Sequence, residues 1–462
     1  MSALTGATSV GLSQVEELLP LSVQQEAFLT LHERYPNWTF LMSTELRLRG
    51  PLDIWALRQS LSLVVQRHES LRTRFVVRDD IARQHIDPVA SVSLEVSAFS
   101  DISNKGIARS VQRVMDELFN SRTNFSSGPL HQFKLIRISR DDHVLIAALN
   151  HAVTDPVSFS LFFRELWQIY GTLVRQRQPI LAPVPVQYAD YAIWQRLVDI
   201  PSKKHFSQYW RTRLAGAIPL RMQADGVARK PRLLVEAQLQ LDKGLSDALS
   251  AVARYNRSTI SQVILAVYAA AAALWCKQSD FILTFGVTSR FRSEHVGVTG
   301  MFASSVPIRI QFMGDETFLD LLSLVSEEVF SACEHFDFGA ASFIENGNAV
   351  NGTYLAWLGD SHDLAGLPSE SERDLLGPEL TVETLRKRSA RTEDALPSDF
   401  DTQCDILWEF RNTPQGILGQ ALYCEGLFLA ENIRQFCLSV RRVANFMVCS
   451  PRMRISEVTR AE

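Results

Sequence analysis

The feature that most constrains this fold is a proline-punctuated stretch that divides the chain into two halves of similar pattern. Three prolines fall within residues 177–196, and their fixed φ angles stiffen a segment that is typical of a connector between compact units. At 462 residues the chain is also longer than one hydrophobic core usually serves. We therefore predict a flexible N-terminus at residues 1–19, a first lobe at 20–180 and a second lobe at 181–462.

Both halves alternate between strand and helix patterns, which predicts an α/β fold class of the α+β two-layer kind. We expect strands at residues 39–50, 71–77, 131–138, 143–151, 232–241, 280–287, 305–312, 353–359, 404–411 and 417–424. We expect helices at residues 21–34, 53–68, 106–119, 158–174, 244–254, 259–277, 317–334 and 429–447. The polar, charge-rich residues 361–400 form either a solvated insertion or a segment that crosses to the other lobe.

Charge and composition exclude several classes of partner. The chain carries 47 basic and 51 acidic residues without a long basic run, so neither nucleic acid nor an anionic membrane is an expected partner. The most apolar stretch, residues 260–276, is broken by Ser261 and Gln262, and we expect a buried core helix there. The six cysteines form no C-x-x-C pair, which indicates reduced core thiols and a cytoplasmic location.

One apolar strand ends in an imidazole and a carboxylate. The segment "LIAALNHAVTDPVSF", residues 145–159, contains Asn150, His151 and Asp155 where the strand gives way to a helix. Sites are commonly built in loops at strand ends, and a neutral imidazole there can take a proton from an incoming nucleophile. Asp155 either orients that ring or, if it is buried, requires a cation of its own.

On spacing alone this pattern has competing interpretations. H-x-x-x-D occurs by chance, and a lone histidine at a strand end is more often a hydrogen-bonded structural residue. A metal site is not expected, because the other nine histidines are scattered and no H-x-x-x-H or C-x-x-C accompanies this one. A Ser-His-Asp hydrolase would need G-x-S-x-G, which is absent.

Other motifs, in order along the chain, accompany the strand end. They are "LPLSVQQEAFL", "RHESLRTRF", "LNHAVTDPVSFSLFFREL", "VPVQYADYAIWQR", "YWRTRLAG", "FGVTSR", "GMFASSVPIR" and "ACEHFDF". Together they resemble the condensation domains of nonribosomal peptide synthetases, which are members of the chloramphenicol acetyltransferase-like superfamily. The resemblance runs from about Pro20 to Ser456, and several motifs in the correct order are more specific than any one of them.

The resemblance implies two chloramphenicol-acetyltransferase-like lobes that form a V around a central tunnel. Acyl or peptidyl carrier proteins, acting in trans, would present a thioester donor and an amine or aminoacyl acceptor. Their 4'-phosphopantetheine arms are substrate tethers, and no cofactor bound to the chain itself is implied. Residues 361–400 would be a latch that crosses onto the first lobe, and residues 287–300 a floor loop beneath the tunnel. A monomer is the expected state.

By motif match, His151 takes the place of the histidine that positions or deprotonates the amine, or that stabilises the tetrahedral intermediate. Asp155 takes the place of the structural aspartate, and its expected partner is Arg290 of "VTSR". That pair would supply the cation that a buried Asp155 requires. The candidate tunnel-lining residues are Ser304, Phe302, Trp357 and Phe338, although aromatic residues in strands pack in cores by default.

Two residues depart from the family's H-H-x-x-x-D-G motif. Asn150 replaces the first histidine, and because an amide cannot titrate it suits an orienting role rather than proton transfer. Pro156 replaces the glycine and removes a backbone N–H, so any polarisation of the thioester carbonyl by that amide is lost. Proline is also well tolerated at the first position of a helix, which makes a simple helix start an equal interpretation.

The functional hypotheses are an amide-forming condensation enzyme that uses His151, with ester formation as a variant, and a degenerate condensation-like domain that recruits a tailoring enzyme. Other CoA-dependent acyl transfer is a third. The sequence leaves open the donor, the acceptor, the stereochemistry, and whether the chain is free-standing or part of a larger synthetase.

Overall fold

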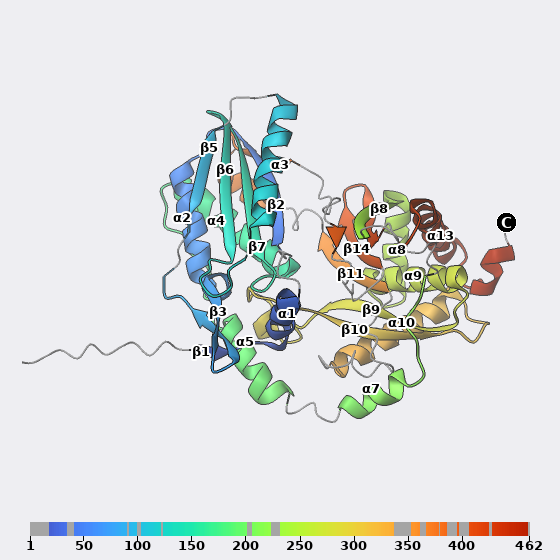
Figure 1. Cartoon of the computed structure of the whole chain (residues 1–462). Helices are drawn as coiled ribbons and strands as arrows, with labels where there is room; N and C mark the ends of the chain where they lie inside the picture. Colours follow the sequence, from blue (N-terminus) through green and yellow to red (C-terminus); the bar gives the residue numbers. More distant parts are fainter. Residues whose placement is uncertain are drawn as a thin grey trace, which may run out of the picture.

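The structure is a computed structural model of the chain. It describes residues 18–34, 41–89, 92–98, 103–121, 123–200, 206–222, 232–336, 353–360, 366–377, 379–385, 395–396, 406–424 and 427–460. Two lobes lie side by side and meet at their lower ends in a V-shaped outline (Figure 1). The predicted α/β class is confirmed, because each lobe contains a sheet with helices packed on it. Of the predicted flexible N-terminus, residues 1–17 lie outside the described residues.

The first lobe is built on a five-stranded sheet in the order β12-β2-β7-β6-β5. These strands are β2 (Leu41–Arg49), β5 (Leu94–Ala98), β6 (His131–Ser139), β7 (Asp142–Asn150) and β12 (Thr381–Thr384). Helices α2 (Ile54–Arg67) and α4 (Pro156–Val174) pack on one face, and α3 (Asn104–Asn120) packs on the other. Because β7 is buried on both faces, its apolar residues run continuously instead of alternating.

The second lobe has a seven-stranded sheet in the order β10-β9-β11-β14-β15-β8-β13. Its strands are β8 (Arg232–Asp242), β9 (Asp280–Thr288), β10 (Ala303–Gln311), β11 (Thr353–Asp360), β13 (Ala395–Leu396), β14 (Ile406–Thr413) and β15 (Gly416–Cys424). Its helices are α7 (Phe206–Leu214), α8 (Lys243–Tyr255), α9 (Ile260–Cys276), α10 (Phe318–Glu334) and α13 (Ala430–Cys449). As expected for residues 260–276, α9 is a buried core helix.

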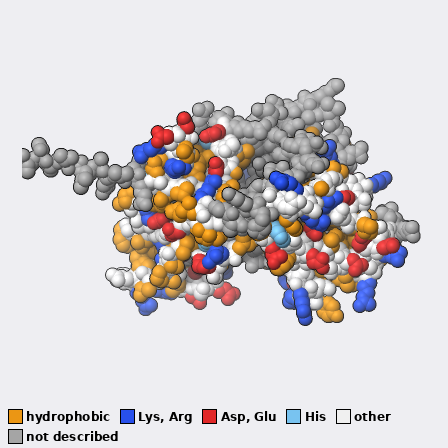
Figure 2. Space-filling view, turned by 90° about the horizontal axis from the view of Figure 1, so that it is seen from below, with side chains coloured by type: hydrophobic (Ala, Val, Ile, Leu, Met, Phe, Trp, Pro, Cys, Tyr) orange, Lys and Arg blue, Asp and Glu red, His pale blue; other side chains and the backbone are white. Residues whose placement is uncertain are grey.

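Within the described chain, no single helix has the length and hydropathy to cross a membrane. Helices α8 and α9 meet that criterion only when they are taken together, and they are bent by 108° relative to each other. Acidic and basic side chains are interspersed on the face that Figure 2 shows.

A smaller region joins the two lobes from below. It contains a sheet in the order β1-β4-β3, the helices α1 and α5, and three short helical turns. Its elements are β1 (Leu18–Pro20), β3 (Thr73–Arg78), β4 (Ile81–Ile86), α1 (Val23–Arg34), α5 (Tyr188–Trp194), η1 (Glu69–Arg72), η2 (Gln195–Asp199) and η3 (Ser293–His295). Leu18 and Leu19 thus belong to a strand rather than to a flexible terminus.

The residues that follow the predicted boundary near residue 180 keep contacts with the first half of the chain. Gln187, which precedes α5, accepts a hydrogen bond from the backbone N–H of Glu69 and donates one to the carbonyl of Arg67. The core of the second lobe begins with α7, where Trp210 is buried. The start of α5 therefore contacts α2 of the first lobe, although α5 belongs to the region that joins the lobes.

The segment expected to act as a latch reaches the first lobe. Strand β12 pairs antiparallel with β2, so the second half of the chain adds an edge strand to the sheet of the first half. Before it, α12 (Glu370–Leu376) lies against α4, and the indole Nε1 of Trp167 donates a 2.8 Å hydrogen bond to the carbonyl of Gly366. Leu376, Leu380 and Val382 are buried in the core of the first lobe.

The close approach of α12 to α4 depends on Gly171. A Cβ at this position would lie 2.6 Å from the Cβ of Leu375 and 2.9 Å from its backbone carbon. We predict that Gly171→Ala lowers the free energy of unfolding by about 1 to 3 kcal/mol, since overpacking outweighs the helix propensity of alanine. Denaturant unfolding measures this loss, and hydrogen exchange should show faster exchange in residues 381–384.

Gly244→Ala is the matched control, because a Cβ there would meet only Asp242 Oδ1 at 3.4 Å. We expect it to leave stability unchanged or to raise it by up to about 1 kcal/mol. Equal effects of the two substitutions would contradict the proposed packing of α12 on α4.

His131 on β6 makes stability depend on pH. Its ring stacks on Phe133 at 5.1 Å, and burial lowers the pKa of the imidazole from 6.5 to about 4. The folded state therefore requires the neutral ring, so this contribution is complete above pH 6.5 and is lost as the pH falls toward 4. We expect a loss of roughly 3 kcal/mol over that window, and a smaller loss in His131→Phe. The measurement is the denaturant midpoint of wild type and of His131→Phe at pH values between 7 and 4. An equal decrease of the midpoint in the two proteins would refute this prediction.

Candidate active site

Strand β7 ends at Asn150, and its chain turns immediately. The backbone N–H of Asn150 donates to the carbonyl of Leu130 at 2.8 Å, and the N–H of Val153 donates to the carbonyl of Asn150 at 3.1 Å. The side-chain Oδ1 of Asn150 accepts a 2.9 Å hydrogen bond from the N–H of Ala152. The Asn150 side chain is 1% exposed, so it fixes the turn that presents His151.

The His151 ring is oriented by the backbone. Its Nδ1 lies 2.8 Å from the carbonyl oxygen of Thr154. The centroid of its ring lies 6.1 Å from the ring centroid of Phe28, which is on α1. A carbonyl oxygen can only accept, so this contact places a proton on Nδ1 and leaves Nε2 with a lone pair. His151 is half-buried, and the arrangement can accept a proton at Nε2.

Asp155 caps helix α4 and is 1% exposed. Its Oδ1 accepts from the N–H of Ser158 at 2.7 Å, and its Oδ2 accepts from the N–H of Phe302 at 3.1 Å. Arg290 Nη1 donates to Oδ2 at 2.5 Å and Nη2 donates to Oδ1 at 3.1 Å. The expected partner of Asp155 is therefore present, with both carboxylate oxygens engaged.

These contacts decide between the two roles considered for Asp155. No hydrogen bond joins Asp155 to His151 among the described residues, and Thr154 orients the ring instead. Of the two roles, orientation of the His151 ring by Asp155 is therefore not supported by its contacts. Because the carboxylate binds Arg290, Asp155 has a structural role and holds α4 and the turn before it in position.

The guanidinium of Arg290 donates hydrogen bonds through both terminal nitrogens, whereas its Nε has no partner among the described residues. It comes from the loop after β9, its side chain is 4% exposed, and it stacks over the Phe302 ring at 4.1 Å. Beyond Asp155, it donates to Ser158 Oγ at 2.7 Å, to the Val298 carbonyl at 3.0 Å and to Thr288 Oγ1 at 3.2 Å. This planar, forked donor fits a buried carboxylate in a way that a lysine would not. The pair joins the second lobe to the start of α4.

Ser158 strengthens the same junction, although the sequence analysis does not identify it. Its Oγ donates to the carbonyl of Gly300 at 2.8 Å and accepts from the N–H of Gly300 at 2.9 Å. A Cβ on Gly300 would lie 1.9 Å from the ring of Tyr188, so only glycine fits there. The Tyr188 hydroxyl donates to the Met301 carbonyl at 2.7 Å and contacts Ser22 Oγ at 2.8 Å. The predicted floor loop is thus packed on α4, α5 and α1.

A buried polar network extends this junction. Gln24 Nε2 donates to Tyr191 Oη at 3.0 Å and to Ser289 Oγ at 2.9 Å. Gln195 Nε2 donates to Tyr191 Oη at 2.9 Å and to Gln24 Oε1 at 3.1 Å. Burial raises the pKa of Tyr191 to about 12, so its phenol stays protonated and donates to Ser289 Oγ. Two glutamines on otherwise apolar helix faces are the sequence signal that could have identified this network.

Pro156 occupies the first position of α4. It is half-buried, and its carbonyl accepts a 3.1 Å hydrogen bond from Ser160 Oγ. This placement agrees with a tolerated helix start, since the N–H at that position has no partner within the helix. It also means that α4 offers no backbone donor at its first residue.

The predicted tunnel-lining residues have separate locations. Phe302 is 0% exposed and packs between Tyr188 and Tyr191, so it supports the lobe junction instead of lining a passage. Trp357 is half-buried against the core of the second lobe. Ser304 is half-buried on β10 opposite Val287 of β9. Phe338 lies outside the described residues.

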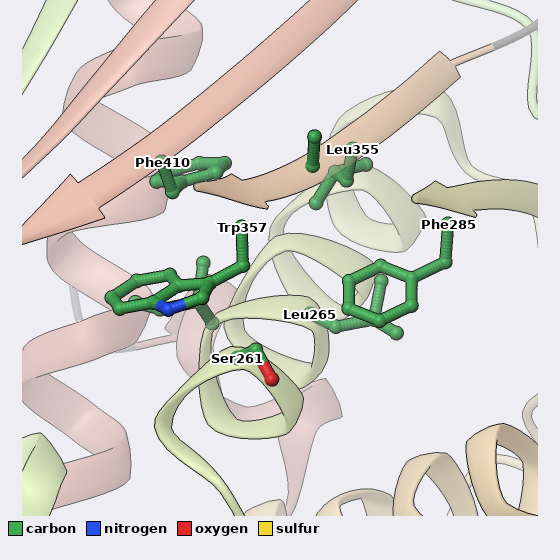
Figure 3. A pocket seen from close by; sticks show the side chains of 8 residues that line it. Ser261, Leu265, Phe285, Leu355, Trp357 and Phe410 are labelled. Atoms are coloured by element: carbon green, nitrogen blue, oxygen red, sulfur yellow. The ribbon is translucent and has the colours of Figure 1, made fainter. Parts of the chain in front are cut away.

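A small hollow lies at one end of α9, between that helix and strands β9, β11 and β14 (Figure 3). Trp357, Phe285 and Phe410 point toward it, with Ser261 at the start of α9. It has no room for a water molecule, whereas typical ligand pockets measure roughly 300 Å³ or more, and none of the residues around His151 lines it. This hollow is therefore a packing gap of the second lobe and not the site of chemistry. The described residues also contain no cluster of three or more His, Cys, Asp or Glu side chains that could hold a metal ion.

Comparison with known proteins agrees with this geometry. A family model described as "Condensation domain" matches residues 15–354. Chondramide synthase cmdD from Chondromyces crocatus is 32% identical over 298 residues, which cover 63% of this chain and 8% of that protein. The probable non-canonical nonribosomal peptide synthetase CymA from Salinispora arenicola is 30% identical over 455 residues, or 96% of this chain and 6% of that protein. The matches cover 2 to 9% of the length of the curated relatives.

Among solved structures, the complex of the X-domain and OxyB from teicoplanin biosynthesis contains a chain with the same fold. The TM-score is 0.76 at 23% identity, with 96% of each chain covered. At this identity the likeness bears on the fold alone.

The buried pair should dominate the response to mutation at this junction. We predict that Asp155→Asn lowers the free energy of unfolding by about 3 to 5 kcal/mol, because the charge of Arg290 is then buried without compensation. Denaturant unfolding is the measurement.

Asp247→Asn serves as the control, since Asp247 pairs with Lys243 on the surface, where both side chains are 62% exposed. We expect it to cost less than about 1 kcal/mol. A similar decrease in the free energy of unfolding in both variants would show that the buried Asp155–Arg290 pair contributes no more to stability than a surface pair.

Proposed function

The chain belongs to the condensation domain family of nonribosomal peptide synthetases, and from that premise we propose that it joins a carrier-bound acyl or aminoacyl thioester to an amine acceptor. The product is an amide, and an alcohol acceptor would give an ester by the same steps. The observation that carries the proposal is the His151 ring, held through Nδ1 with Nε2 left as a proton acceptor.

The reaction follows from that lone pair. The acceptor amine attacks the thioester carbonyl carbon, a C–N bond forms, and the carbonyl becomes an oxyanion. His151 Nε2 takes the proton that the nitrogen loses. When the oxyanion collapses, the C–S bond breaks and the thiolate leaves with the proton from the imidazolium. Proton transfer by a positioned imidazole contributes roughly 10²- to 10⁴-fold in rate.

The other residues have supporting roles in this proposal. Asp155 and Arg290 hold α4 against the floor loop, so the turn that carries His151 is fixed relative to both lobes. Carrier proteins with 4'-phosphopantetheine arms are the partners that this proposal requires, because the donor is a tethered thioester. The cytoplasmic location and monomeric state expected from the sequence belong to the same proposal.

A second candidate function is recruitment of a tailoring enzyme without catalysis. Asn150 and Pro156 depart from the family's motif, and the fold resembles that of the X-domain, which forms a complex with OxyB. On this hypothesis His151 has no catalytic role, and the partner is an oxygenase that acts on a carrier-bound peptide.

We predict that His151→Ala lowers product formation by at least roughly 100-fold in a single-turnover assay with acyl-loaded carrier protein and amine acceptors. The physical reason is the loss of the proton acceptor at Nε2. Because the ring is half-buried, the unfolding midpoint should change little.

His85→Ala is the control, since His85 lies on β4 and contacts Asp87. It should keep wild-type turnover. Equal rates for wild type and His151→Ala would remove the proposed role. If neither protein forms product but both bind a partner oxygenase with equal affinity in a titration, recruitment is the function.

A further inference from the structure

The Asn150 side chain has one polar atom that the protein leaves without a partner. Its Oδ1 faces the N–H of Ala152, so the planar amide must direct Nδ2 the opposite way. Nδ2 makes no hydrogen bond to another described residue, and it is not one of the enclosed side-chain atoms that lack a partner. An amide donor that the protein leaves free in this way can be satisfied by water or by a bound group.

The position of this donor limits what can satisfy it. Asn150 directly precedes His151, and both backbone groups of Asn150 are engaged in hydrogen bonds. The side chain therefore cannot turn without breaking the contact to Ala152 that shapes the turn. As an amide it stays neutral at every pH, so it donates without competing with His151 for a proton.

A donor is missing from the same turn. The residue at the first position of a helix normally directs its N–H out of the helix end, where it can bind an anion or a developing negative charge. In α4 that residue is Pro156, which has no N–H. The next capped amide, that of Ser158, is already bound to Asp155 Oδ1 at 2.7 Å.

We propose that Asn150 is a catalytic residue whose Nδ2 donates a hydrogen bond to the carbonyl oxygen of the donor thioester. This inference rests on the proposed condensation function. The bond strengthens when the amine adds and the carbonyl oxygen becomes an oxyanion, and it weakens again when the C–S bond breaks and the carbonyl re-forms. The two departures from the family's motif then compensate each other: Pro156 removes a backbone donor and Asn150 supplies a side-chain donor.

A double-mutant cycle tests this compensation. Asn150→Ser keeps an oxygen that can accept from the N–H of Ala152 but has no amide donor, and Pro156→Ala restores the backbone N–H. We expect Asn150→Ser to lower kcat by roughly 100-fold in the wild-type background, with KM little changed. In the Pro156→Ala background the same substitution should lower kcat by less than about 10-fold, since the restored amide replaces the lost donor. Equal factors in the two backgrounds would overturn the proposal.

A second variant separates loss of the donor from loss of the fold. Asn150→Asp is isosteric and retains the acceptor for Ala152, so it should show the same fall in kcat as Asn150→Ser. Because a carboxylate at this buried position lowers the unfolding midpoint, kcat is measured at a temperature where the unfolding curve shows the variant to be folded. Wild-type kcat in Asn150→Asp would refute the donor role.

If the wild type forms no product, that result counts against the proposed condensation function. A binding measurement then still tests whether Asn150 donates a hydrogen bond. The probe is an acyl-pantetheine analogue in which nitrogen replaces the thioester sulfur, titrated against the full chain. Weaker binding by at least about 10-fold in Asn150→Ser would support the donor. Equal affinity, or no binding by the wild type, would overturn it.

Discussion

The structure depends on one buried ion pair between residues that are 135 positions apart. The Asp155 carboxylate starts helix α4, and the Arg290 guanidinium comes from the loop after β9. Removing two charges from water is expensive, and the pair is tolerated because both carboxylate oxygens and most guanidinium donors have partners. The same network that satisfies these charges also fixes one lobe to the other. Stability and the geometry of the site therefore share one origin.

This arrangement separates two tasks that a histidine and a neighbouring aspartate often share. In many hydrolytic sites a carboxylate orients the imidazole and stabilises its charged form. Here the Thr154 carbonyl orients His151, while Asp155 is committed to Arg290. A neutral backbone oxygen fixes the tautomer without favouring the imidazolium as strongly as an anion would. The orientation of the ring is thus independent of the ion pair that joins the lobes.

Much of this architecture could be predicted from the sequence, and its gaps have physical reasons. The continuous apolar run of β7 predicted the strand and the position of its end. The family motif that contains Arg290 implied the buried pair with Asp155. Ser158 and Gly300 could not be identified, because their contact spans 142 positions and depends on a close approach that has no local pattern. The domain boundary near residue 180 stays a prediction, since prolines report backbone stiffness and not which lobe a following helix packs on. Phe302 was expected to line the tunnel from the family resemblance, whereas its packing between Tyr188 and Tyr191 depends on tertiary contacts that have no local pattern.

The pairing of β12 with β2 has a consequence for how the chain is made. The sheet of the first lobe is complete only when residues 381–384 have been synthesised, long after the strand they join. Until then the edge of β2 is open, with backbone donors and acceptors that can recruit another chain. A truncated product that ends near the proline-punctuated stretch would keep that open edge permanently. Nascent chains of this fold therefore have a long interval in which aggregation competes with completion of the first lobe.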